Sequence, residues 1–145
     1  MSSSSTPRDD APQPRARVVV YSDDRTTRAA VVRALGRRPA RDVPFVDVVE
    51  VATEPALIRV MDAGGVDLAI LDGEAVPAGG MGIARQLKDE IYRCPPLLVL
   101  TGRPTDLWLA TWSRADAAVP HPLDPRVLAD TAATLLRRRL ARPVA

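Results

Sequence analysis

Asp72 is the residue of this chain best placed to do chemistry, because it follows directly on a nearly continuous apolar run. Residues 66–71 read Val-Asp-Leu-Ala-Ile-Leu. A short run of this kind is typical of a strand that is covered on both faces, as in a parallel sheet. Such sheets carry their binding and catalytic groups just past the carboxyl ends of the strands. The Asp72 carboxylate therefore either ends a strand or belongs to a site.

Polar residues also follow three other apolar runs, at the positions where strands would end: Asp23 and Asp24, Thr101, and His121. Carboxylates that are brought together repel one another unless a cation lies between them. Magnesium suits such a place, because it prefers hard oxygen ligands and often binds one or two carboxylates. A carboxylate beside the ion could attack phosphorus and form an acyl phosphate, while a hydroxyl and a cation hold the phosphoryl oxygens.

The apolar runs predict five strands, at residues 17–21, 45–51, 66–71, 97–100 and 117–119. Apolar residues at helical spacing follow each strand, in residues 25–36, 53–64, 83–91, 104–114 and 124–139. This alternation implies right-handed crossovers and a parallel sheet with helices on both faces.

The predicted fold is therefore α/β, a flavodoxin-like (βα)5 doubly wound parallel sheet with strand order 2-1-3-4-5. Asp47 and Glu50 make residues 45–51 polar enough for an edge strand, as that order requires. Strands one, three, four and five are then neighbours, so Asp72 and the other polar residues meet at one rim of the sheet.

Composition limits the class of protein. The chain has 145 residues, enough for one domain with a real core, and 46% of them are hydrophobic. Its net charge is +2, and Lys88 is the only lysine, so the arginines look like the bias of a GC-rich genome rather than a nucleic-acid footprint. The single cysteine, Cys94, fits a reducing cytoplasm. No apolar run approaches the roughly 20 residues of a membrane span, so we expect a cytoplasmic protein without membrane insertion.

Five motifs in order resemble the receiver domains of bacterial two-component response regulators. They are residues 18–24, residues 66–72, Pro77 with the glycines at 79, 80 and 82, residues 97–101, and residues 115–122. The resemblance implies a receiver-like domain at residues 17–140, followed by a C-terminal tail at 141–145. Residues 1–16 are rich in Ser, Pro and Arg and are predicted to be a disordered tail. The resemblance also implies signal transduction without enzymatic turnover, beyond Mg²⁺-dependent self-phosphorylation and dephosphorylation at Asp72.

The same resemblance assigns roles to the rim residues. Asp72 is the phosphoacceptor, and Thr101 contacts the phosphoryl group. His121, next to Pro122, stands where the family has a lysine. Mg²⁺ would be held by Asp23, Asp24, Asp72 and the backbone carbonyl of Glu74.

Several positions depart from the family pattern. Ser22 occupies the first acidic position, with Asp23 at the second. A histidine is charged only part of the time near neutral pH, unlike the lysine that His121 replaces. Ala118 stands where the family has the aromatic residue of its activation switch, and the loop after Asp72 is about one residue longer. The sequence therefore predicts an atypical receiver.

Plain structural roles compete with these assignments. Asp72 could simply end a strand, Asp23 or Asp24 could cap the following helix, and Thr101 could satisfy backbone groups. His121 lies between two prolines and could be an ordinary loop residue. Trp108 and Trp112, spaced i, i+4 on the predicted helix at 104–114, could pack on the sheet or form a docking patch.

Three functions remain open. The leading one is a stand-alone atypical receiver that works as a protein–protein binding module, independently of phosphorylation, because no output domain follows residue 140. The second is a phospho-switch driven by a histidine kinase with Mg²⁺. The third is a permanent accessory subunit of a larger assembly, which is either cytoplasmic or peripheral to a membrane. We expect the partner surface to be the fourth helix, fifth strand and fifth helix, or the tails; no helix-turn-helix indicates nucleic acid.

Overall fold

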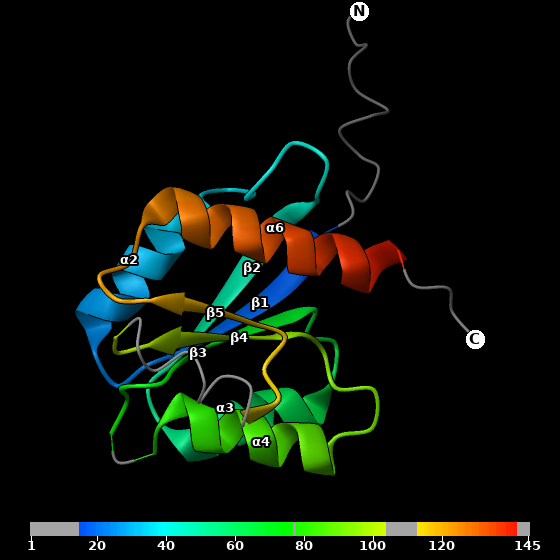
Figure 1. Ribbon diagram of the computed structural model, residues 1–145. Coiled ribbons are helices and arrows are strands. Elements are labelled where there is room, and N and C mark those ends of the chain that lie inside the picture. Colours follow the sequence, from blue (N-terminus) through cyan, green and yellow to red (C-terminus); the bar gives the residue numbers. More distant parts are fainter. Residues whose placement is uncertain (1–14, 77, 104–112, 142–145) are drawn as a thin grey trace, which may run out of the picture.

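A five-stranded parallel sheet runs through the centre of the molecule (Figure 1). The computed structural model describes residues 15–76, 78–103 and 113–141. Its strands are β1 (Arg15–Tyr21), β2 (Phe45–Val51), β3 (Leu68–Asp72), β4 (Leu97–Thr101) and β5 (Ala117–Pro120). All neighbouring strands pair in parallel, in the order β2-β1-β3-β4-β5. The predicted fold and strand order are confirmed.

The described helices cover both faces of the sheet. Figure 1 shows α2 (Arg25–Leu35) and α6 (Pro125–Ala141) on one face, with α3 (Glu54–Ala63) and α4 (Gly80–Glu90) on the other. Successive side chains of each strand point to opposite faces of the sheet, because a strand has a period of two residues. Leu68 and Ile70 pack with α2 and α6, whereas Ala69 and Leu71 pack with α3 and α4. Burial on both faces explains the continuous apolar runs in the sequence.

Two strand starts differ from the predictions. β1 begins at Arg15, two residues before the predicted start, so Arg15 and the fully buried Ala16 belong to the sheet and not to a tail. β3 begins at Leu68, two residues after the predicted start. The Arg17 backbone N–H donates to Asp67 Oδ2 at 2.9 Å, and the Asp67 N–H donates to the Arg17 carbonyl at 2.8 Å. A polar side chain that binds the neighbouring strand thus precedes β3.

The edge position of β2 is confirmed, and its acidic residues are paired. Asp47 accepts a hydrogen bond from Arg15 Nε at 2.8 Å, and Glu50 accepts one from Arg28 Nε at 3.1 Å.

The predicted helix at 104–114 lies almost entirely outside the described residues, and with it Trp108 and Trp112. None of the described helices combines the length and apolar character needed to cross a bilayer.

The start of α4 packs directly against the end of β3. A Cβ on Gly80 would lie 2.7 Å from the Asp72 carbonyl oxygen and 2.9 Å from the Leu71 carbonyl carbon. Only a residue without a side chain allows this approach. The start of α4 therefore lies directly against the carboxyl end of β3.

Substituting two glycines of α4 should have opposite effects. Gly80→Ala should lower the free energy of unfolding by about 1–3 kcal/mol, because the new methyl group meets backbone atoms that cannot move aside. Gly82→Ala meets nothing within 4 Å and should raise it by roughly 0.5–1 kcal/mol through helix propensity. Urea unfolding followed by circular dichroism measures both. Equal effects of the two variants would contradict the close packing at Gly80.

Candidate functional site

Asp72 ends β3 as a buried carboxylate with only 3% of its surface exposed. Its Oδ2 accepts a hydrogen bond from the Ser22 hydroxyl at 2.7 Å. Its Oδ1 accepts one from the Glu74 backbone N–H at 2.9 Å. A buried carboxylate needs such donors, because losing its water without compensation is costly. Both oxygens of the predicted phosphoacceptor therefore already have a donor within the protein.

Ser22 is held in place from several directions. It is fully buried, and its Oγ also accepts a hydrogen bond from the Asp24 N–H at 3.0 Å. Its own N–H donates to the Val51 carbonyl at 3.2 Å, and Arg28 Nη1 donates to its carbonyl at 2.7 Å. The hydroxyl that binds Asp72 is thus fixed by β2, by the cap of α2 and by the Arg28 guanidinium.

His121 lies beside Asp72, as the sequence predicts. Its Nε2 is 3.6 Å from Asp72 Oδ1, which makes an ion pair when the imidazole is protonated but is too long for a good hydrogen bond. The His121 N–H donates to the Thr101 carbonyl at 2.8 Å. Within the described residues, His121 Nε2 and Thr101 Oγ1 are shielded from solvent and have no hydrogen-bond partner.

The other acidic residues are engaged in local structure. Asp23 Oδ1 accepts a hydrogen bond from the Val76 N–H at 3.1 Å. Asp24 caps α2, since its Oδ1 accepts from the Thr26 N–H at 2.8 Å. A Cβ on Gly102 would lie 2.5 Å from Glu74 Cδ, so the Glu74 carboxylate packs directly against the Gly102 backbone.

These residues share a hollow, which we call the rim pocket. It has a volume of about 400 Å³ and is lined by Asp23, Asp24, Thr27, Asp72, Glu74, Gly102 and His121. The structure therefore brings the predicted residues together at the carboxyl end of the sheet. From the sequence, Ser22 is recognised only as a replacement of the first acidic residue of the receiver pattern. The hydrogen bond from its hydroxyl to Asp72 is not predicted.

The donors in the rim pocket do not fit a magnesium ion as they are arranged. No group of three Asp, Glu, His or Cys residues in the described ranges comes together as metal ligands would. The Asp23, Asp24 and Asp72 carboxylates instead each accept a hydrogen bond from a protein donor: the Val76 N–H, the Thr26 N–H and the Ser22 hydroxyl, respectively. The predicted ligands share a pocket but do not converge on one point, and the role of the Glu74 carbonyl stays a prediction.

Tyr21, at the end of β1, supports the loop under the rim pocket. It is buried, and its hydroxyl donates to the Ala78 carbonyl at 2.5 Å. Burial raises the pKa of the Tyr21 phenol above its ordinary value of 10.0, and the negative charges of Glu54, Asp23 and Asp72 raise it further. The phenol therefore stays protonated and keeps its hydrogen bond across the physiological pH range. From the sequence, Tyr21 is predicted only as the last residue of a strand.

Comparison with known proteins decides the family. No protein-family model matches the chain. Two curated proteins, both described as uncharacterized response regulatory proteins, are each 66% identical to it over 121 residues. They come from Mycobacterium tuberculosis strains CDC 1551 and H37Rv, and the match covers 83% of this chain and 91% of each relative. The chain belongs to the response regulator receiver family. The predicted resemblance is confirmed.

Solved structures agree on the fold of this receiver domain. The receiver domain of a signal transduction histidine kinase from Syntrophus aciditrophicus is 21% identical, with a TM-score of 0.72, covering 90% of this chain and 96% of that one. The chemotaxis response regulator CheY4 of Vibrio cholerae is 18% identical, with a TM-score of 0.69, covering 84% and 99%. Receiver domains are signalling modules that interact with partner proteins, and they generally bind Mg²⁺ at the phosphorylation site.

Removing the Ser22 hydroxyl should destabilise the receiver domain. Ser22→Ala leaves the buried Asp72 Oδ2 without its donor, and we expect the free energy of unfolding to fall by about 1–3 kcal/mol. Thr134→Ala is the matched control, because the Thr134 hydroxyl also makes a hydrogen bond but is exposed on α6. The control should change stability by less than about 0.5 kcal/mol. A Ser22→Ala variant as stable as the control would contradict the hydrogen bond.

Stability should fall at alkaline pH through Tyr21. The unfolded phenol ionises near its ordinary pKa of 10.0, whereas the folded phenol holds its proton to higher pH. The contribution of the Tyr21 phenol to the free energy of unfolding is therefore complete below about pH 10. It is lost as the pH rises through the pKa of the phenol in the folded chain. Tyr21→Phe should be less stable by about 1 kcal/mol at neutral pH and should lose less stability above pH 10 than the parent chain. Tyr92→Phe, at an exposed site, is the control and should keep the parental pH profile.

Proposed function

We propose that this chain is an atypical receiver domain that works as a protein–protein binding module, and that its docking does not require phosphorylation of Asp72. The observation that carries this proposal is the hydrogen bond from the Ser22 hydroxyl to Asp72 Oδ2. A neutral hydroxyl stands where the family has an acidic residue, so the buried Asp72 carboxylate is satisfied without a cation.

The surroundings of Asp72 support a phosphoryl group less well than the family pattern does. An Asp72 oxygen must be free to attack phosphorus, and charge must be neutralised as the phosphoryl group arrives. Here one oxygen binds Ser22 and the other binds the Glu74 N–H. His121 replaces a permanently charged lysine, which weakens the electrostatic support for a phosphoryl group.

The conformational part of the family's switch is also altered. Ala118 in β5 stands where the family has an aromatic residue that swings inward on activation. The methyl group of alanine is too small to make this movement. As the partner surface we propose β5 and α6 together with residues 104–114, which the sequence predicts to be a helix that carries Trp108 and Trp112. Tryptophan is enriched among the residues that dominate binding energy.

A working phospho-switch is the second candidate, and one observation favours it. Thr101 Oγ1 and His121 Nε2 are both buried and have no hydrogen-bond partner within the described residues. A phosphoryl group on Asp72 would offer oxygens to these two atoms. Their residues are neighbours, because the His121 N–H donates a hydrogen bond to the Thr101 carbonyl. In that case Asp72 would accept phosphate from a histidine kinase with Mg²⁺.

Acetyl phosphate with MgCl₂ distinguishes the two candidates. We expect the intact mass of the folded chain to stay unchanged, because Ser22 replaces an acidic residue of the family pattern and His121 replaces its permanently charged lysine. A receiver domain known to be phosphorylated under the same conditions is the positive control. A gain of one phosphoryl group that Asp72→Asn abolishes would favour the phospho-switch.

Partner docking tests the other half of the proposal. The parent chain and Asp72→Asn, immobilised at equal density, should capture the same proteins in equal amounts, and treatment with acetyl phosphate should not change the amounts. A partner that is captured only by the phosphorylated parent chain would overturn the proposed function.

A further inference from the structure

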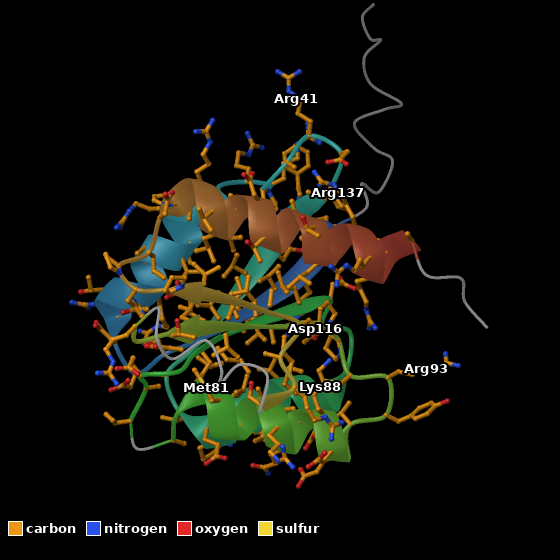
Figure 2. All side chains as sticks on the ribbon, in the orientation of Figure 1. Arg41, Met81, Lys88, Arg93, Asp116 and Arg137 are labelled. Atoms are coloured by element: carbon orange, nitrogen blue, oxygen red, sulfur yellow. The ribbon has the colours of Figure 1, made fainter. Side chains whose placement is uncertain are left out.

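A second pocket lies at the opposite end of the sheet from Asp72, and we call it the amino-end pocket. It has a volume of about 630 Å³, within the range of small-molecule sites. Its lining includes Pro96, which directly precedes β4, and Asp116, which directly precedes β5. Figure 2 shows Lys88 of α4 and Asp116 on the same side of the molecule. Since strands of a parallel sheet share one direction, this pocket is remote from the rim pocket.

The charge of the amino-end pocket is positive. Lys88, Arg138 and Arg139 line it, against one lining carboxylate, Asp116. Asp116 Oδ2 is already bound by Lys88 Nζ at 2.7 Å and by the Leu97 N–H at 2.8 Å. This carboxylate is therefore neutralised within the wall and does not repel a negative ligand.

The two arginines keep donors for a ligand. Arg139 Nε is 3.9 Å from Asp67 Oδ1, and its Nη2 is 3.5 Å from the Val66 carbonyl, so both contacts are long and weak. Arg138 is exposed and makes no ion pair with any residue that the structure describes. Guanidinium groups bind carboxylate and phosphate through paired N–H donors, which makes them suited to anions.

The remaining wall is apolar and uncharged. It is formed by Cys94, Pro96, Leu135 and Ala141. Burial raises the pKa of the Cys94 thiol above its ordinary value of 9.0, so the thiol adds no negative charge near neutral pH. A ligand with an anionic head and a short apolar body would match both parts of the lining.

We propose that the amino-end pocket binds a small organic anion, with Arg138 and Arg139 on its carboxylate or phosphate group and its apolar body against Cys94, Pro96 and Leu135. The site is separate from Asp72 and does not rest on the proposed function. Asp72→Asn should therefore leave binding here unchanged, so failure of one proposal does not touch the other.

Alkylation of Cys94 tests the charge of the pocket directly. Cys94 is the only cysteine of the chain, so intact mass reports its modification alone. The rate with anionic iodoacetate, divided by the rate with neutral iodoacetamide, should be several-fold higher in the folded chain than in urea. Arg138→Gln and Arg139→Gln should each lower this ratio, whereas Arg126→Gln, at the exposed start of α6, should not. A ratio that is equal in the folded and unfolded chain would overturn the proposal.

Protection of Cys94 tests ligand binding. Phenyl phosphate should slow iodoacetamide labelling in a saturable manner, and inorganic phosphate should need about ten-fold higher concentration because it lacks the apolar body. Arg138→Gln and Arg139→Gln should each weaken protection about ten-fold or more, through loss of a charge-assisted hydrogen bond. Equal melting temperatures of the variants and the parent chain verify folding. No protection, or protection unchanged by both arginine substitutions, would overturn the proposal.

Discussion

A buried carboxylate must have its hydrogen bonds satisfied, and in this receiver domain a neutral hydroxyl satisfies one of them. Asp72 lies at the end of a strand whose residues are all buried. The Ser22 hydroxyl and the Glu74 N–H donate to its two oxygens. Ser22 is in turn fixed by backbone contacts to Val51 and Asp24. The fold itself thus supplies one donor to each oxygen of Asp72.

The parallel sheet separates two chemically different ends of the molecule. At the carboxyl ends of the strands, the rim pocket is lined mostly by acidic side chains. At the amino ends, the amino-end pocket is lined by Lys88, Arg138 and Arg139. Both pockets are assembled from residues that are distant in sequence. The amino-end pocket in addition takes residues from α4 and α6, which lie on opposite faces of the sheet (Figure 1).

The fold could be predicted from the sequence because each strand leaves its own pattern of apolar and polar residues within a short segment of the chain. Strands buried on both faces leave continuous apolar runs, and β2 revealed its edge position through Asp47 and Glu50. Strand starts were less well predicted, since Asp67 binds β1 through its side chain and only the three-dimensional neighbour reveals this. The capping role of Asp24 was weighed from sequence and is present in the structure.

The site was predicted only in part, because its chemistry depends on pairings over long sequence distances. Asp72, Thr101 and His121 could be placed at one rim by strand order alone. The Ser22 to Asp72 hydrogen bond joins residues fifty positions apart, and the sequence showed only that Ser22 departs from a pattern. The amino-end pocket had no sequence signal, since Lys88, Cys94, Asp116 and the arginines of α6 are scattered along the chain and meet only after folding.

The thermal stability of two chains in MgCl₂ tests the central claim most directly. The account predicts that the melting temperature of the parent chain does not change when MgCl₂ replaces an equal ionic strength of NaCl. Ser22→Asp, which restores a second carboxylate beside Asp72, should melt lower than the parent in NaCl and recover when Mg²⁺ is added, because like charges then share a cation. A parent chain that Mg²⁺ stabilises as strongly as Ser22→Asp would contradict the account.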